Sequence, residues 1–91
     1  MPLNFTWDGR KASANLKKHG VTFEEAATVF GDPLALAIED LGHDERTLML
    51  GMSKRRRILL VVHQELDDAN IRIISARRAT THERRRYEEA T

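Results

Sequence analysis

The sequence has no cysteine, few aromatic residues and no long hydrophobic run. Without cysteine, disulfides, thiolate zinc sites, iron–sulfur clusters and a cysteine nucleophile are all excluded. No purely apolar run is longer than that at Ile58–Val62, which is far shorter than the roughly 20 residues that a membrane helix needs. The first residues also lack the basic start and the long apolar stretch of a signal peptide. We therefore expect a cytoplasmic protein that does not contact a membrane.

The composition is that of a small globular protein. Of the 91 residues, 41% are hydrophobic and 32% are charged, which is not the balance of a disordered chain. A chain of this length buries roughly 60–65% of its unfolded surface, enough for one modest core. There are only two prolines and no repeat, linker or low-complexity segment. We therefore expect a single domain over residues 1–91.

The net charge of +1 hides an asymmetry between the two halves of the chain. Residues 1–45 carry 4 basic and 8 acidic side chains, whereas residues 46–91 carry 11 basic and 6 acidic ones. Ten of those 11 basic residues are arginine, whose planar fork of donors matches a phosphate group. The second half therefore indicates either a phosphate-binding face or an ordinary solvated surface with local ion pairs.

The first third of the chain predicts a short strand and a helix. Apolar and polar residues alternate over Leu3–Trp7, which favours a strand. Asp8 can cap a helix that runs to about His19. Gly20 can then take the left-handed conformation that ends many helices.

A second helix is predicted after that glycine. Thr22-Phe23-Glu24-Glu25 has the spacing of a capping box, in which the Glu25 side chain reaches back to the backbone of Thr22. Apolar residues at helical spacing continue to Phe30, and Gly31-Asp32-Pro33 ends the helix.

The remaining chain predicts strands and one more helix. The hydrophobic period falls to 2 in four segments, at residues 34–38, 46–52, 57–65 and 70–77. Short turns join them, one of them at residues 41–44, so neighbours must pair antiparallel. Thr80-Thr81-His82-Glu83 is a second capping box and begins a polar helix. We predict an α+β fold: a short N-terminal strand, two helices, a four-stranded antiparallel meander and a C-terminal helix, with the helices against one sheet face.

The segment at residues 57–65 is apolar on both faces, which predicts a central strand covered on both sides. The core candidates are Trp7, Phe23, Phe30, Leu48, Leu60, Val62 and Ile73.

Arginines mark the ends of the last two predicted strands. By a period of 2, Arg57 and His63 share a face of one strand, while Arg72, Ile74, Ala76 and Arg78 share a face of the next and Arg77 lies on the other face. The pair Arg77-Arg78 precedes a helix N-terminus, where backbone amides and guanidinium groups together favour an anion. The alternative is that both side chains face water.

No motif in the sequence indicates a metal site, an acyl-transfer site or a nucleotide-hydrolysis site. Neither a metal ion nor another cofactor is therefore expected. Metal-free RNA cleavage needs a base for the 2′-hydroxyl, a cation for the crowded phosphorane and an acid for the leaving oxygen. Arginine, lysine, histidine and glutamate can supply these roles, although many proteins contain such a set.

Two stretches of the chain resemble the BrnT-type toxin family. The first comprises Phe5-x-Trp7-Asp8-x-x-Lys11, Asn15, Lys18-His19-Gly20-Val21-x-Phe23-x-x-Ala26 and Phe30-x-Asp32. The second comprises Arg57, Val61-Val62, Ile71-Arg72-Ile73-Ile74-Ser75-Ala76-Arg77-Arg78-Ala79-Thr80, Glu83-Arg84 and Tyr87. Together they cover almost the whole chain, in the order and spacing of the family.

The resemblance implies a RelE-like fold and a ribonuclease toxin of a bacterial type II toxin–antitoxin system, which cleaves RNA without a metal ion and inhibits translation and growth. It also implies a hetero-oligomer with a BrnA-like antitoxin, and contact with operator DNA only through that antitoxin. The positions that match the family's polar signature imply a catalytic set of Lys18, His19, Arg57, Arg77, Arg78 and Glu83. Arg56, Arg72 and Tyr87 are implied as RNA contacts.

The chain departs from the family at Lys54-Arg55-Arg56-Arg57, where the family commonly has a Gly-Arg turn. Either Arg56 or Arg57 is therefore the aligned arginine.

Each of these residues also has a structural explanation. Lys18 and His19 suit the negative end of a helix, and Glu83 suits the capping box. Tyr87 can pack the last helix onto the sheet or stack on a base, and Arg72 can pair with an acidic residue, Glu65 or Asp67, across the hairpin. The sequence thus leaves two alternatives to an enzyme: a non-catalytic nucleic-acid-binding module, or a degenerate toxin that only binds its antitoxin.

Overall fold

The computed structural model describes residues 2–39 and 45–90, so the turn predicted at residues 41–44 lies outside them. The elements in chain order are β1 (Asn4–Thr6), α1 (Gly9–His19), α2 (Phe23–Thr28), the 3₁₀ helix η1 (Val29–Gly31), β2 (Leu36–Glu39), β3 (Thr47–Met52), β4 (Ile58–Glu65), β5 (Asn70–Arg78) and α3 (Thr81–Glu89). The predicted α+β fold is confirmed.

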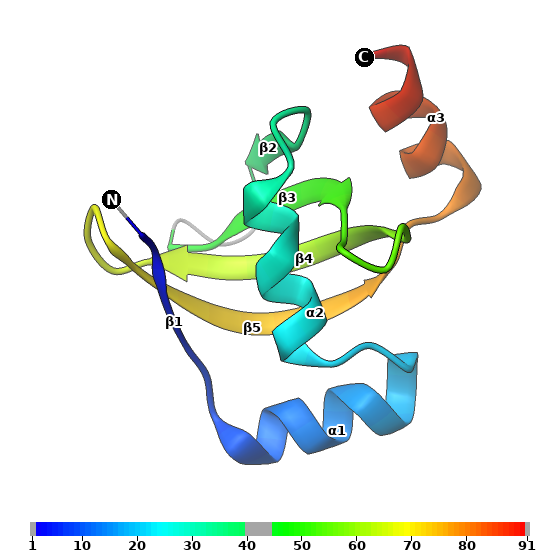
Figure 1. Ribbon diagram of the computed structural model, residues 1–91. Coiled ribbons are helices and arrows are strands. Elements are labelled where there is room, and N and C mark those ends of the chain that lie inside the picture. The colour runs from blue at the N-terminus through cyan, green and yellow to red at the C-terminus, as the bar shows by residue number, and fades with distance from the viewer. Residues whose placement is uncertain (1, 40–44, 91) are drawn as a thin grey trace.

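The strands form one five-stranded mixed sheet in the order β1-β5-β4-β3-β2. Strands β2 to β5 are the predicted antiparallel meander. The short strand β1 adds a fifth strand, which pairs parallel with the first part of β5. Figure 1 shows β1 at one edge of the sheet and α2 crossing in front of it. Strand β4 is therefore central, as its two apolar faces predicted.

Helices α1 and α2 lie against one face of the sheet and α3 packs on the other, so the prediction that all helices lie against one face was wrong. Phe23 and Ala26 of α2 pack with Leu59 and Val61 of β4 on one face. Leu60 points to the opposite face, because side chains alternate along a strand, and there it packs with Leu50 of β3 and Tyr87 of α3. The polar helix α3 thus supplies one large buried side chain to the cluster on the second face of β4.

Three of the predicted core residues, Phe23, Leu60 and Ile73, are buried. The other four are half-buried: Trp7, Phe30, Leu48 and Val62. The edge of the Trp7 ring still packs on Phe23, with 5.9 Å between the ring centroids.

A β-bulge in β5 changes the faces predicted for its side chains. Val62 pairs with Ser75, but the next residue of β4, His63, pairs with Ile73. The residue between those two partners, Ile74, has no partner in β4. The regular alternation of side chains between the two faces is therefore interrupted at Ile74. Ile73 and Ala76 lie in one buried cluster although they are three positions apart, an odd spacing that regular alternation would place on opposite faces. Ala76 and Arg78 share a face, as predicted, but the prediction that Arg72 shares it with them was wrong.

Three of the four helix caps predicted from the sequence are present in full. The Asp8 carboxylate accepts hydrogen bonds from two backbone amides of α1, and Gly20 ends that helix at a φ of 69°. Thr80 and Glu83 form the predicted capping box of α3. At the start of α2, Thr22 accepts from the amide of Glu25, but the Glu25 side chain makes other contacts, described below. The second half of that capping box was predicted wrongly.

Asn15 fixes the position of α1 beside the sheet. It is the buried polar residue of this helix, and its side-chain amide donates to the carbonyl of Ala76 at 2.8 Å and to that of Val21 at 3.0 Å. Its Oδ1 accepts from the amide of Ala76 at 3.1 Å. The side chain therefore continues the hydrogen bonding of the β5 edge, whose pairing with β1 ends at Arg72.

His63 is fully buried in β4, and neither ring nitrogen has a partner of normal hydrogen-bond geometry among the described residues. The ring lies edge-on to Phe30, with 4.8 Å between the centroids. Burial lowers the pKa of His63 below its usual 6.5. The neutral ring therefore leaves two polar atoms without compensation in the core.

We expect His63→Leu to raise the free energy of unfolding by about 1–2 kcal/mol, because it removes those uncompensated polar atoms. The unfolded state binds the proton more readily than the folded state, so the wild type loses stability as the pH falls below 6.5. His63→Leu should flatten that part of the pH profile. Urea unfolding at several pH values measures both effects, with the exposed His82→Gln as control. A less stable His63→Leu variant would contradict this account.

Candidate active site

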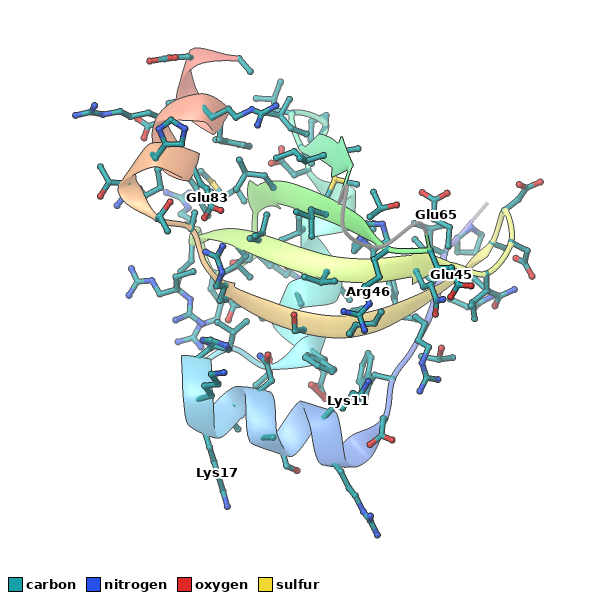
Figure 2. The ribbon with its side chains drawn as sticks, turned by 180° about the vertical axis from the view of Figure 1, so that it is seen from behind. Lys11, Lys17, Glu45, Arg46, Glu65 and Glu83 are labelled. Atoms are coloured by element: carbon teal, nitrogen blue, oxygen red, sulfur yellow. The ribbon has the colours of Figure 1, made fainter. Side chains whose placement is uncertain are left out.

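A groove of about 320 Å³ opens where the β3–β4 turn, the end of β5 and helix α3 meet. Four arginines line it, and three of them, Arg56, Arg78 and Arg84, are exposed. The full lining is Met52, Arg56, Arg57, Ile58, Arg78, Ala79, Arg84, Tyr87 and Glu88. In Figure 2, nitrogen-tipped side chains gather between α3, marked by Glu83, and α1, marked by Lys17. A guanidinium cluster of this kind suits an anionic ligand such as a phosphate group.

The tight turn between β3 and β4 sets the position of Arg56. The amide of Arg56 donates to the carbonyl of Ser53, and the amide of Ser53 donates to the carbonyl of Arg57. Arg56 has a φ of 64°, the left-handed conformation that glycine adopts at this point of a three-residue hairpin loop. Arg56 therefore occupies the position of this turn at which glycine is favoured, and Arg57 is the residue that follows it.

Arg57 is held by Glu25 of α2. Its Nε donates to Oε2 of Glu25 at 2.9 Å and its Nη2 donates to Oε1, while the Glu25 side chain is 4% exposed. The Ser53 hydroxyl donates to the same carboxylate at 2.7 Å. The hydrogen bonds from Arg57 and, to a smaller extent, from Ser53 hold the pKa of Glu25 below its usual 4.5. This network fixes the β3–β4 turn to α2, and Glu25 was missed because its spacing from Thr22 suggested only a helix cap.

Arg77 forms a fork-to-fork pair with Glu83. Its two terminal nitrogens donate to the two carboxylate oxygens at 2.8 and 3.0 Å. Hydrogen bonds from Arg77, then from the Thr80 amide, lower the pKa of Glu83. The carboxylate thus joins the end of β5 to the first turn of α3. Arg77 lies opposite Leu60 and Arg78 opposite Leu59, on the two different faces of the sheet.

Tyr87 anchors α3 to the sheet. The side chain is 5% exposed, and its hydroxyl donates to Oδ2 of Asp32 at 2.6 Å. The same oxygen accepts from the amide of Met52 at 2.9 Å. Burial and the hydrogen bond to Asp32 raise the pKa of Tyr87 to about 12. Of the two roles considered for Tyr87, packing is the one its contacts display, and base stacking stays a prediction.

The C-terminal end of α1 lies beside the groove. Nη2 of Arg57 donates to the carbonyl of Gly20 at 3.2 Å, directly after the predicted site residues Lys18 and His19. Lys18 is exposed and His19 is half-buried. Arg72, by contrast, lies opposite Gln64 and beside Thr6, six residues before Arg78 and hence roughly 20 Å along β5. Arg72 is therefore apart from the other predicted site residues.

The groove also contains Arg84, which was not among the predicted site residues. Arg84, Tyr87 and Glu88 recur at spacings of three and four, so they share one face of α3. That spacing was available in the sequence, but which face of α3 meets the sheet depends on the burial of Tyr87. In the described part of the chain, no group of three histidine, aspartate or glutamate residues is placed to hold a metal ion. Nor does any described helix have the length and apolar character to cross a membrane.

We expect Arg56→Gly to stabilise the protein. Glycine relieves the strain of the left-handed φ, which is worth about 1–2 kcal/mol. The greater freedom of glycine in the unfolded chain offsets part of this gain, so the free energy of unfolding should rise by about 0.5–1 kcal/mol. The neighbouring Arg55→Gly removes the same charge at a residue without positive φ and should lower stability. Thermal unfolding of both variants tests this. An Arg56→Gly variant no more stable than the wild type would contradict the strain at Arg56.

The comparisons with known proteins agree with this architecture. Residues 7–83 match the family described as the ribonuclease toxin, BrnT, of type II toxin–antitoxin systems. The fold is similar to the crystal structure of the Brucella abortus ribonuclease toxin BrnT, with a TM-score of 0.71 and 21% sequence identity over 87% of this chain and 99% of that chain. No curated protein sequence matches the chain. The family match spans most of the sequence, and the chain belongs to the BrnT family of ribonuclease toxins of type II toxin–antitoxin systems.

Proposed function

We propose that the protein is a metal-independent endoribonuclease that cleaves RNA in the arginine groove and thereby inhibits translation and growth. The observation that carries the proposal is the convergence of Arg56, Arg78 and Arg84 from three elements on one groove. Arginines fixed by different elements can bind a phosphate from several sides, and they stabilise the extra charge that develops on the phosphorane.

Two residues are candidates for moving protons. Both oxygens of Glu83 accept from Arg77, and one of them also accepts from the amide of Thr80. Glu83 would have to give up these bonds to act as a base, so its contacts favour a positioning role at the start of α3. His19 lies at the end of α1 beside the carbonyl that binds Arg57. We propose His19 as the proton-transfer group and Lys18 as a further cation.

We also propose that a BrnA-like antitoxin neutralises the protein by covering this groove. The groove is basic and partly apolar, with Met52, Ile58 and Ala79 in its lining. Such a surface suits an acidic, amphipathic segment that folds as it binds. Contact with operator DNA would then run through the antitoxin.

The test is cleavage of a defined single-stranded RNA by the purified protein, with and without EDTA. A metal-independent endoribonuclease cuts at internal positions, and EDTA does not slow it. Attack by the 2′-hydroxyl would leave a 2′,3′-cyclic phosphate on one product and a 5′-hydroxyl on the other. The matched control is the triple variant Arg56→Gln, Arg78→Gln, Arg84→Gln, which keeps polar side chains at exposed positions.

Three results would overturn parts of this proposal. Cleavage that EDTA abolishes would contradict metal independence. Equal cleavage by the triple variant would place the active site outside the groove. Salt-sensitive binding that leaves the RNA intact would instead favour a non-catalytic RNA-binding module.

A further inference from the structure

The outer face of α1 carries a row of cations that the groove does not include. All the basic residues of residues 1–45 lie on this helix, although that half of the chain is acidic overall, and the helix contains no acidic residue. These residues are Arg10, Lys11, Lys17 and Lys18, and all of them are exposed. Asn15 points the other way, to the edge of β5. The helix thus presents positive charge to solvent in its first and last turns.

Arg10 and Lys17 are seven residues apart, so they share the outermost face at a separation of roughly 10 Å along the helix. Between them the residues are small, and the surface forms a shallow hollow lined by Asp8, Gly9, Arg10, Ser13, Ala14 and Lys17. The carboxylate of Asp8 at one end accepts from the amides of Arg10 and Lys11. Figure 2 shows Lys17 projecting away from the sheet.

This face continues into the arginine groove. The carbonyl of Gly20, directly after α1, accepts from Arg57, and Arg57 lines the groove. Lys17 and Lys18 occupy the last turn of α1, next to that junction. The groove itself, at about 320 Å³, is near the lower limit of ligand pockets, roughly 300 Å³. A longer RNA strand bound there must therefore run on over a neighbouring surface.

We propose that the outer face of α1 binds the sugar–phosphate backbone of single-stranded RNA as it leaves the groove. This proposal rests on the proposed function, because it extends the path of the same substrate. Charge complementarity and continuity with the groove support it: a polyanion that enters among Arg57, Arg78 and Arg84 meets one pair of cations in the last turn of α1 and another in its first turn. Such contacts would add affinity for long RNA and leave the chemical step unchanged.

The experiment measures binding of a labelled, fully 2′-O-methylated single-stranded RNA of about 12 nucleotides, which 2′-hydroxyl attack cannot cleave. The variant is Arg10→Glu/Lys17→Glu, two exposed changes, with the fold checked by thermal unfolding. We expect affinity to fall about tenfold at 50 mM salt, and the slope of log K against log salt to decrease by about 1.4, since each single-strand phosphate contact contributes about 0.7. Arg46→Glu, just before β3, is the control for charge reversal.

Cleavage kinetics separate this proposal from the proposed function. The α1 variant should raise KM for a long RNA and leave kcat unchanged, and a tetranucleotide too short to reach α1 should be cleaved at the wild-type rate. If Arg78→Ala abolishes cleavage but the α1 variant binds RNA like the wild type, the α1 proposal is overturned and the proposed function stands. If neither Arg78→Ala nor the α1 variant changes RNA binding or cleavage, the α1 proposal and the proposed function are both overturned. If the α1 variant keeps RNA affinity but loses antitoxin binding, the face belongs to the partner protein, and the proposal is again overturned.

Discussion

Replacing Glu25 by alanine is expected to lower the free energy of unfolding by about 3 kcal/mol. The substitution removes the carboxylate that receives two guanidinium nitrogens of Arg57 and the hydroxyl of Ser53. Breaking a buried ion pair costs about 3–5 kcal/mol, because the remaining charge loses its compensation. The Arg57 side chain is 22% exposed, so water recovers part of this and the lower figure applies.

The pH dependence of this pair has a definite sign. Because Arg57 lowers the pKa of Glu25, the ionised carboxylate stabilises the fold fully above pH 4.5, and that stability is lost as the pH falls through the lower pKa of the folded state. Chemical unfolding at pH 7 and pH 4 should therefore show a smaller difference between Glu25→Ala and the wild type at the lower pH. The exposed neighbour Glu24→Ala should change stability by less than about 0.5 kcal/mol. An equal effect of the two substitutions at pH 7 would contradict the ion-pair account.

The features that sequence predicts well are those decided by local chemistry. The continuous apolar run within residues 57–65 predicted β4 and its central place, since a strand that is apolar on both faces is buried on both. The caps at Asp8 and Gly20 depend only on hydrogen bonds and φ angles within one turn. The family motifs singled out Arg57 and Arg78, which line the groove, but Arg84 was not among the predicted site residues. Spacing alone gives no distances between elements.

The features that sequence reasoning missed depend on competition between distant partners. Glu25 could bond to the backbone of Thr22 or to Arg57, 32 residues away, and the charged partner prevails because its hydrogen bonds are charge-assisted. The bulge at Ile74 has no marker such as glycine, so a strict period of 2 misplaced Arg72. The left-handed φ of Arg56 cannot be predicted from the residue type, because arginine rarely adopts it. It follows only from the geometry of the β3–β4 turn.

Arg78→Ala is expected to reduce kcat/KM for RNA cleavage by about 10²–10³-fold and to leave stability within about 0.5 kcal/mol of the wild type. Arg78 is exposed and lines the groove at the end of β5. Its guanidinium is placed to meet a phosphate without first leaving a buried partner. The measurements are cleavage of a defined RNA and thermal unfolding of the same preparations, with expression and growth followed in a bacterial host.

The adjacent Arg77→Ala should behave differently, although the sequence treats the two arginines as a pair. Arg77 lies on the other face of β5 and binds both oxygens of Glu83. Its loss removes a partly exposed ion pair at the start of α3, which costs about 1 kcal/mol. We expect a lower Tm and a smaller loss of activity than for Arg78→Ala, because the helix that carries Arg84 and Tyr87 is less firmly placed. If Arg77→Ala abolished cleavage at full stability while Arg78→Ala remained active, the phosphate would bind on the face of Arg77, and the ion pair with Glu83 would have to open for the substrate to enter.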